Sequence, residues 1–214
     1  MGQCAVGGLP QDLKYAGEES ALIIGDENIV REFVTINIGT AAGSWITSMG
    51  NKNLIMACAH VAHDCVIEDN VILGNNVLLA GHVRVESNAI VSGGAAVNHF
   101  VTIGTLAMVG GMARVIQDIP PFMIAEGAPA RARGVNVVGL KRREYSKEAI
   151  AELRDAFRRL IADETPTTVA IQTMESETNL LPDTRRLIAF LREMDRGFQG
   201  RYRESLRRNL EEGL

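Results

Sequence analysis

The sequence predicts an all-β, left-handed parallel β-helix built from hexapeptide repeats, followed by a small C-terminal α-helical domain. Three observations lead to this prediction. An aliphatic residue recurs every six positions, a small or β-branched residue follows four positions after each, and a helical apolar pattern replaces the repeat after residue 145.

The six-residue period runs without a miss through the central part of the chain. Its aliphatic positions are Met49, Ile55, Val61, Ile67, Leu73, Leu79, Val85, Val91, Val97, Ile103, Val109 and Val115. An earlier run, Ile24, Val30 and Ile36, keeps the same spacing before a Gly-rich interruption from Gly39 to Gly50. A helix repeats every 3.6 residues and a strand every two, so neither explains this period.

Three six-residue sides close a triangular coil, and successive coils stack through strand-type hydrogen bonds. Position one of each hexapeptide then points into the prism, and so does position five, which must be small because the interior is narrow. Residues such as Cys65, Ala89 and Ala95 fit that position, and aromatic residues make up only 5% of the chain. Gly74 and Asn98, at position two, are expected to form the corners.

The repeat is expected to end at Pro120-Pro121, because proline cannot donate to a further coil. We therefore predict a β-helix over 1–121, an exit segment over 122–145 and a helical domain over 146–214. Ser146 is the expected cap of a first helix that Pro166 ends, a looser stretch follows, and Asp183 is the expected cap of a second helix. The tail from Arg201 could form a third helix or fray.

The bulk properties of the chain narrow its class. No apolar run reaches the roughly 18 residues that cross a bilayer, and the N-terminus lacks the basic region and apolar stretch of a signal peptide. The cysteines, Cys4, Cys58 and Cys65, are odd in number and lack metal-finger spacing. We expect a cytoplasmic protein with no membrane span and no nucleic-acid partner.

Charge is divided unevenly along the chain. Residues 1–130 hold 5 Lys and Arg against 12 Asp and Glu, whereas residues 131–214 hold 17 against 14. The basic excess of the C-terminal part is typical of a surface for an anionic partner, or of an ordinary solvated helical surface.

The histidines are the candidate reactive groups. They are His60, His63, His82 and His99, and the six-residue register points all of them out of the prism. His63, His82 and His99 share one side of three successive coils, and Asp64 stacks on His82. Gly81, between His63 and His99, leaves room for a ligand. The cluster is consistent with general-base catalysis, with a metal site or with a merely polar face.

Several segments carry a family resemblance. They are Gln11-Asp12-Leu13-Lys14-Tyr15, Ala59-His60-Val61-Ala62-His63-Asp64-Cys65, Leu79-Ala80-Gly81-His82-Val83, Gln117-Asp118-Ile119-Pro120-Pro121, Gly134-Val135-Asn136 and Gly139-Leu140-Lys141-Arg142-Arg143. This set closely resembles the UDP-N-acetylglucosamine acyltransferases that begin lipid A synthesis, and the match covers nearly the whole chain.

The resemblance implies a reaction in which a 3-hydroxyacyl group passes from acyl carrier protein to the glucosamine 3-hydroxyl of the UDP-sugar. His63 matches the catalytic base, Asp64 the acid that supports it, and His82 a second active-site histidine. Backbone N–H groups near Gly81 would stabilise the oxyanion. His60 belongs to the same segment and is expected to line the substrate site.

The remaining expected substrate contacts also come from the resemblance. Asp12 and Lys14 match residues near the sugar and the acyl group. Gly111 matches a position that sets the length of the acyl chain. The matches to nucleotide contacts, which place a nucleotide-binding loop in the exit segment, are Asn136, Arg142 and Arg143. Alternatively, these residues could have no substrate contact: the two arginines could simply flank the start of a helix, and glycine could be tolerated at position 111 because a side chain there would face outward.

The implied assembly is a homotrimer with active sites between adjacent prisms. Its partners would be acyl carrier protein and a UDP-amino sugar, with no cofactor and no metal. A zinc site of the kind found in other β-helix enzymes is disfavoured, because Gly104 stands where a third histidine would be expected.

The chain also departs from the family pattern. Asn98 and His99 replace an expected His and Gln, Asn37-Ile38 an expected His-Arg, and Val138 a nucleotide-contacting Glu. Compared with the family pattern, the coils of this chain also start about three coils later. Two alternatives therefore stay open: acyl or acetyl transfer to another nucleotide sugar, and a catalytically silent β-helix that acts as a binding protein. Acyl length, sugar identity and O- versus N-acylation are not fixed by the sequence.

Overall fold

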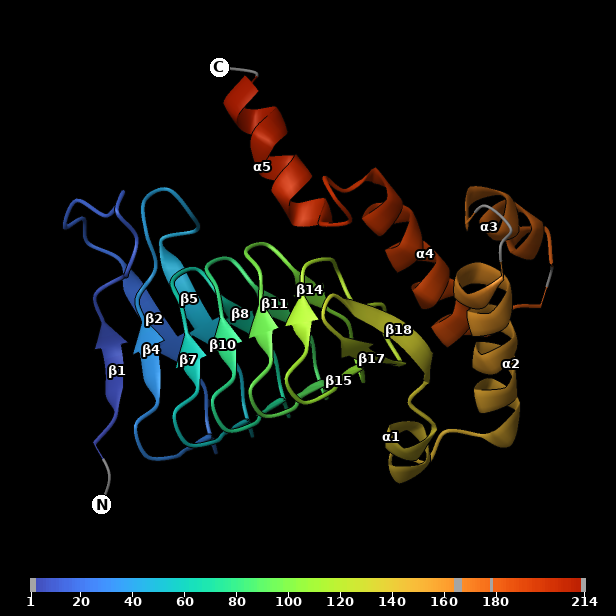
Figure 1. The fold of residues 1–214 in the computed structure, drawn as a ribbon, viewed down its shortest axis with the longest axis horizontal. Helices are drawn as coiled ribbons and strands as arrows, with labels where there is room; N and C mark the ends of the chain where they lie inside the picture. Colours follow the sequence, from blue (N-terminus) through green and yellow to red (C-terminus); the bar gives the residue numbers. More distant parts are fainter. Residues whose placement is uncertain (1–2, 164–166, 178, 213–214) are drawn as a thin grey trace.

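The computed structural model describes residues 3–163, 167–177 and 179–212. It shows a stack of coils that form a prism, with helices at and above one end (Figure 1). The first face of the prism contains β1 (Ala5–Gly8), β4 (Thr35–Asn37), β7 (His60–Val61), β10 (Leu78–Leu79), β13 (Ala96–Val97) and β16 (Arg114–Val115). The second contains β2 (Ala21–Ile24), β5 (Ile46–Met49), β8 (Val66–Ile67), β11 (Arg84–Val85) and β14 (Thr102–Ile103). The third contains β3 (Ile29–Val30), β6 (Leu54–Ile55), β9 (Ile72–Leu73), β12 (Ile90–Val91), β15 (Met108–Val109), β17 (Met123–Gly127) and β18 (Ala130–Val135).

The pairing confirms the predicted coil length. In the central coils each strand pairs in parallel with strands eighteen residues away; Leu78, for example, lies opposite His60 on one side and Ala96 on the other. The interior is also as predicted. Every position-one residue from Ile55 to Val115 is at most 3% exposed, and the position-five residues Cys65, Ala89 and Ala95 are fully buried.

Ile24 keeps the predicted register, since it lies opposite the buried position-one residue Met49, but it is 37% exposed. Its strand β2 lies at the edge of its sheet and pairs only with β5, so no further coil covers it.

The corners lie elsewhere than predicted. The left-handed residue of each turn is position four, not position two: φ is 59° at Asp64, 57° at Asn70 and Asn76, and 63° at His82. Asn, Asp and His occupy this conformation more often than other non-glycine residues, whereas bulky residues adopt it at a higher cost. Most corners of the coils lack glycine, and the corner residues Asp64 and His82 are also functional candidates.

The β-structure continues past Pro120-Pro121, where the repeat was expected to end. Strand β17 adds one more parallel strand to β15, with Ile124 opposite Met108, and β18 then returns antiparallel to β17. The two prolines occupy the turn before β17, so their missing N–H groups cost no ladder hydrogen bond. The division into separate domains stays a prediction.

The helices follow as α1 (Val137–Arg142), α2 (Lys147–Phe157) with its π-helical continuation η1 (Arg158–Ala162), α3 (Thr167–Glu175), α4 (Pro182–Arg196) and α5 (Tyr202–Glu212). A second core unites buried residues of these helices, including Leu140, Leu153 and Leu187, with Phe122 and Met123 of the exit segment. Ser146 caps α2 as predicted, since its hydroxyl accepts from the Ala149 N–H. No helix among the described residues is long and apolar enough to cross a membrane.

Two expectations about the helices were wrong. The stretch predicted to be loose contains α3, whose residues Ala170, Ile171 and Met174 are buried against the second core, so packing outweighs its β-branched start. Asp183 does not cap α4; Leu181 is the N-cap and Pro182 takes the first helical position. The expected stop at Pro166 lies outside the described residues. The tail is helical over α5.

Adjacent leucines of β10 provide a test of the inward register. Leu79 is fully buried and Leu78 is 52% exposed. We expect Leu79→Ala to lower the free energy of unfolding by about 2–5 kcal/mol, because it leaves a cavity in the prism. The matched variant Leu78→Ala should change it by about 0.5 kcal/mol or less. Urea unfolding measures both, and equal losses would contradict the register.

Candidate active site

The predicted site residues come together where two stacked turns follow β7 and β10. His63 and Asp64 belong to the first turn, and Gly81 and His82 belong to the next turn along the same edge. Asp64 and His82 are eighteen residues apart and both occupy the left-handed corner, so the coil places one above the other. Asp64 Oδ2 lies 3.9 Å from His82 Nδ1, which confirms the predicted stacking.

The Asp64 carboxylate is the centre of a hydrogen-bond network. It accepts from His63 Nδ1 (2.8 Å), from the hydroxyl and backbone N–H of Thr40 (2.5 and 3.1 Å) and from the backbone N–H of Ser44 (3.0 Å). Burial would raise the pKa of Asp64, but the hydrogen bonds from His63 and Thr40 outweigh it and hold this pKa at about 2. Asp64 is therefore ionised at neutral pH.

The loop that carries Thr40 and Ser44 is part of the Gly-rich interruption. A Cβ on Gly43 would lie 2.2 Å from Asp64 Cγ, so only glycine lets the loop approach the carboxylate this closely. Nothing periodic in the sequence indicated that this segment supplies two partners of Asp64.

The network fixes the protonation geometry of His63. Because ionised Asp64 can only accept, the neutral form of the His63 ring carries its proton on Nδ1, which leaves the lone pair on Nε2. His63 Nε2 lies 3.9 Å from Asp12 Oδ2, which brings the predicted residue Asp12 to the site. A base nitrogen oriented by a carboxylate on its opposite side is an arrangement suited to general-base catalysis.

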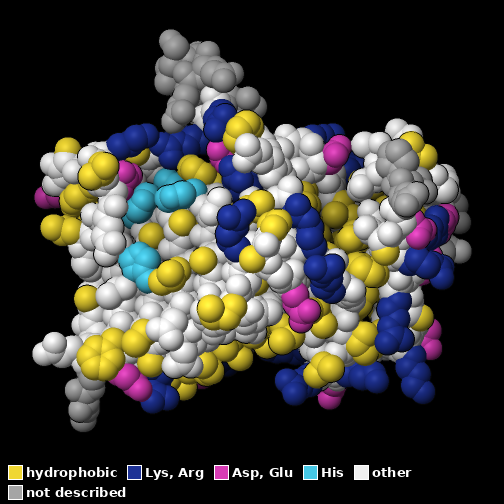
Figure 2. Space-filling view, in the orientation of Figure 1, with side chains coloured by type: hydrophobic (Ala, Val, Ile, Leu, Met, Phe, Trp, Pro, Cys, Tyr) yellow, Lys and Arg dark blue, Asp and Glu magenta, His cyan; other side chains and the backbone are white. Residues whose placement is uncertain are grey.

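His63 faces a shallow cavity of about 350 Å³. The lining residues are Gln11, His60, Ala62, His63, Leu78, Leu79, Ala80, Gly81, Ala96, Val97, Asn98 and His99. Figure 2 shows histidine side chains on one face of the prism, with hydrophobic side chains beside them. The cavity therefore combines one oriented base with a floor of small and aliphatic residues.

Gly81 is required beside the base. A Cβ at this position would lie 2.5 Å from His63 Cε1, so any side chain would displace the ring. Asn98 and His99, the pair that departs from the family pattern, are exposed at the cavity. His60 contributes a half-buried ring whose Nδ1 lies 2.7 Å from the Thr35 hydroxyl, and burial together with the nearby His63 lowers the pKa of His60.

His82 is enclosed by other side chains. Its ring stacks on Phe100 at 4.3 Å, meets the His63 ring edge-on at 5.1 Å, and has Arg207 Nη1 3.3 Å from its Nε2. Burial, together with the charges of His63, Arg207 and Arg203, lowers the pKa of His82 to about 4 despite the opposing effect of Asp64.

His63 and His82 point out of the prism, as the register predicted, but they are not exposed. They are 7% and 8% exposed, because neighbouring segments of the chain cover them. A merely polar surface therefore does not describe these two residues.

The predicted nucleotide contacts lie apart from the histidines within one chain. Asn136 is buried and its side chain is fully engaged: Oδ1 caps α1 by accepting from the Gly139 N–H, and Nδ2 donates to the Leu106 carbonyl. Arg142 and Arg143 lie at the C-terminal end of α1, not at a helix start. Lys14 and Gly111 are exposed, and a Cβ on Gly111 would meet only the Gly93 carbonyl at 3.4 Å.

His63, Asp64 and His82 also form the one group within the described part of the chain whose ligand atoms could surround a cation, all lying within 4.8 Å of one another. The oxygens of Asp64 already accept five hydrogen bonds, the longest from the Ser44 hydroxyl at 3.5 Å, so a metal would have to displace some of them. The absence of a metal stays a prediction.

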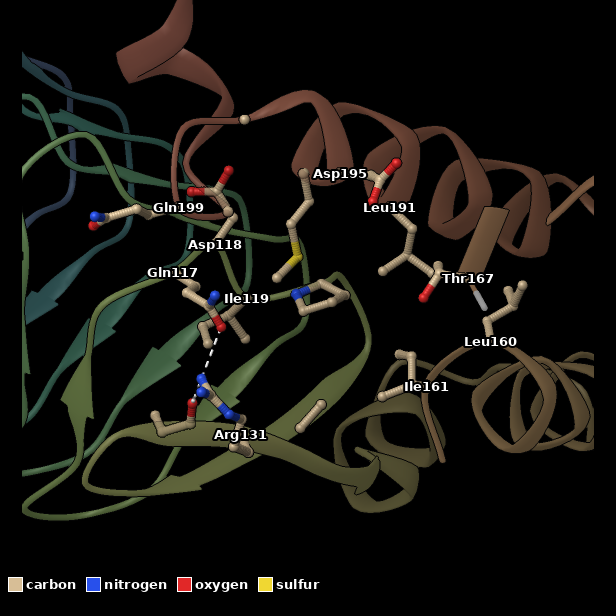
Figure 3. A pocket seen from close by; sticks show the side chains of 16 residues that line it. Gln117, Asp118, Ile119, Arg131, Leu160, Ile161, Thr167, Leu191, Asp195 and Gln199 are labelled. Carbon is tan, nitrogen blue, oxygen red and sulfur yellow. Dashed lines mark hydrogen bonds between the residues drawn. The ribbon is translucent and has the colours of Figure 1, made fainter. Parts of the chain in front are cut away.

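A second cavity, of about 420 Å³, separates the last coils from the helical region. Figure 3 shows it between Gln117, which accepts a hydrogen bond from Arg131, and the side chains of Leu160, Ile161 and Leu191. None of the predicted site residues lines this cavity.

Comparisons with known proteins agree with the geometry. The family described as Udp N-acetylglucosamine O-acyltransferase, Domain 2, matches residues 118–199, and bacterial transferase hexapeptide repeats match residues 46–81. A protein of Gloeothece citriformis named acyl-[acyl-carrier-protein]–UDP-N-acetylglucosamine O-acyltransferase is 48% identical over 81% of this chain and 63% of its own length. The chain thus spans less than two thirds of that relative. A protein of the same name from Anaeromyxobacter sp. (strain K) is 40% identical over 89% of this chain and 74% of its own.

Solved structures show the same architecture. The UDP-N-acetylglucosamine acyltransferase of Bacteroides fragilis is 40% identical, with a TM-score of 0.85 over 88% of this chain and 74% of its own. The acyltransferase of Arabidopsis is 35% identical, with a TM-score of 0.82 over 87% and 67%. These structures confirm the predicted left-handed parallel β-helix with a C-terminal helical region. The chain belongs to the UDP-N-acetylglucosamine O-acyltransferase family.

Proposed function

We propose that this chain transfers a 3-hydroxyacyl group from the thioester of acyl carrier protein to the 3-hydroxyl of UDP-N-acetylglucosamine, the reaction that begins lipid A synthesis. The observation that carries the proposal is the orientation of His63. Asp64 accepts a hydrogen bond from His63 Nδ1, and His63 lines a cavity that is also lined by Leu79, Ala80 and Gly81. The unprotonated Nε2 is then the nitrogen available to a substrate.

The reaction follows from this arrangement. His63 Nε2 takes the proton of the sugar hydroxyl as that oxygen attacks the thioester carbonyl. The negative charge of Asp64 stabilises the imidazolium that forms, as in other base–carboxylate pairs. The carbon–sulfur bond then breaks, and the leaving thiolate of the carrier takes the proton back from His63. Backbone N–H groups near Gly81 would stabilise the tetrahedral oxyanion.

Substrate recognition is assigned to the cavity and its surroundings. The apolar floor suits an acyl chain, while Asp12, Lys14 and His60 would contact the sugar and the thioester region. Gly111, open on its outer side, would leave the acyl groove long. The guanidinium groups of Arg142 and Arg143 suit a nucleotide diphosphate.

We further propose that the working unit is a homotrimer. Arg142 and Arg143 do not join His63 within one chain, whereas an active site between adjacent prisms would bring the base of one subunit to the nucleotide-binding arginines of another. Asn136 would act indirectly, by capping the helix that carries the arginines.

A second acceptor is favoured by one observation. Asn98 and His99 line the cavity in place of the expected His and Gln, so the groups that face the sugar are altered. A UDP-sugar with an amino group at the 3-position is the alternative acceptor, and a panel of both sugars separates O- from N-acylation.

The base assignment predicts the effect of removing His63. We expect His63→Ala to lower kcat for hydroxyacyl transfer about 100-fold to 10,000-fold, since general-base catalysis contributes about that much. Lys52→Ala, which alters an exposed side chain outside the cavity, should stay within a few-fold of the unaltered protein. A turnover assay with long-chain hydroxyacyl carrier protein measures both, and full activity in His63→Ala would refute the assignment.

The Thr40 contact predicts a shift in the acidity of Asp64. Thr40→Val removes the hydroxyl that donates at 2.5 Å, so the pKa of Asp64 should rise from about 2 towards its ordinary value. Thr35→Val, whose hydroxyl contacts His60 instead, is the matched control. Carboxyl carbon NMR titration follows the change, and an unmoved pKa in Thr40→Val would show that the hydroxyl does not support the carboxylate.

The shared site predicts complementation between inactive subunits. His63→Ala and Arg143→Ala chains should each be inactive or strongly impaired alone. When they are unfolded together and refolded as mixed trimers, some interfaces combine an intact His63 with an intact Arg143, and activity should reappear. Refolded His63→Ala alone is the control. Mixed trimers without recovered activity would place both residues in one subunit's site.

A further inference from the structure

Helix α5 begins just beyond residues 118–199, the part of the chain that the family model matches, yet it returns to the site (Figure 1). Its start is fixed to the prism by Asp118, which is buried and accepts from the backbone N–H groups of Tyr202 and Thr102 at 3.0 and 2.7 Å. Arg201 donates to the Ile116 carbonyl at 2.8 Å. The helix therefore leaves the last coils in a defined direction.

Two arginines, one helical turn apart on α5, reach His82. Arg203 Nη1 donates to the His82 carbonyl at 2.5 Å, and Arg207 Nη1 lies 3.3 Å from His82 Nε2. The Arg207 guanidinium also lies 5.4 Å from the centre of the Phe100 ring that stacks on His82. The imidazole is thus held on one face by Phe100 and at its outer nitrogen by Arg207.

The chemistry of guanidinium determines where the His82 proton lies. Arginine carries only donors, so His82 Nε2 must accept and the single proton of a neutral ring must be on Nδ1. His82 Nδ1 faces Asp64 Oδ2 at 3.9 Å, too far for a hydrogen bond but close enough for electrostatic attraction. Protonating Nε2 would place two cations against each other.

The charged and titratable groups around His82 agree with a neutral ring. They are Asp64 and His63 from the preceding coil and Arg203 and Arg207 from α5, and the arginines and His63 oppose a positive charge that Asp64 alone favours. His82 does not line the cavity that His63 faces. We therefore assign its effect to Asp64 and His63, the two groups of the site that it lies against.

We propose that Arg207 is a positioning residue that holds His82 in the neutral Nδ1–H form, so that the negative charge of Asp64 serves His63 alone. The role in catalysis rests on the proposed acyl transfer. If His82 became cationic, it would compete with His63 for the same carboxylate oxygen, and the imidazolium formed on His63 during the reaction would be less stabilised.

The direct test is the state of the His82 ring in the full chain without substrate. Long-range proton–nitrogen NMR of histidine-labelled protein, with His82 assigned through His82→Gln, should show the Nδ1–H form. Arg207→Ala should populate the Nε2–H form and raise the pKa of His82. Arg208→Ala is the matched control, because Arg208 pairs with Glu204 and lies over Phe198, not over His82.

The kinetic test uses the same variants. Arg207→Ala should lower kcat about tenfold near pH 6 and less at pH 8, with KM nearly unchanged, because a cationic His82 forms only in acid. An Nε2–H ring in the unaltered protein, an unchanged ring in Arg207→Ala, or an equal effect of Arg208→Ala would overturn the proposal. Because the ring state is read without substrate, it decides the role of Arg207 even if acyl transfer itself is not found.

Discussion

In the central coils each strand hydrogen-bonds to strands eighteen residues before and after it, and this register positions the chemistry. It brings Asp64 beneath His82 and Gly81 beside His63, although neither pair is adjacent in the chain. Because the aliphatic residues inside the prism lock every coil in register, the turns that project from it cannot slide relative to one another. A stack of simple repeats thus acts as a rigid holder for a few polar side chains.

Much of the fold follows from periodicity, which is a local property. The six-residue ladder predicted the coil, its inward positions and the stacking of Asp64 on His82 correctly. It misplaced the left-handed corner, because glycine at position two reflects close approach between coils: a Cβ on Gly104 would lie 2.5 Å from the Pro121 nitrogen. A glycine in a repeat can mark either a turn or a contact, and spacing alone does not distinguish them.

The parts that sequence reasoning missed depend on long-range packing. Thr40 and Ser44 lie in a segment without period, and nothing local shows that they reach Asp64. Arg207 comes from a helix more than a hundred residues after His82. Helix α3 was missed because its stability comes from the burial of Ile171 and Met174. The start of α4, in contrast, could have been predicted, because Pro182 occupies the first helical position, where proline is common.

The corner conformation of Asp64 and His82 carries a consequence for how this protein can change. Both residues sit at φ near +60°, where other coils carry asparagine (Asn70, Asn76 and Asn88) or larger residues such as Phe100 and Leu106. A non-glycine residue there costs on the order of 1 kcal/mol of backbone strain, and less for asparagine. A drift of His82 to asparagine would therefore relax the turn while removing the imidazole. Selection for thermal robustness alone would push this chain towards an inert scaffold.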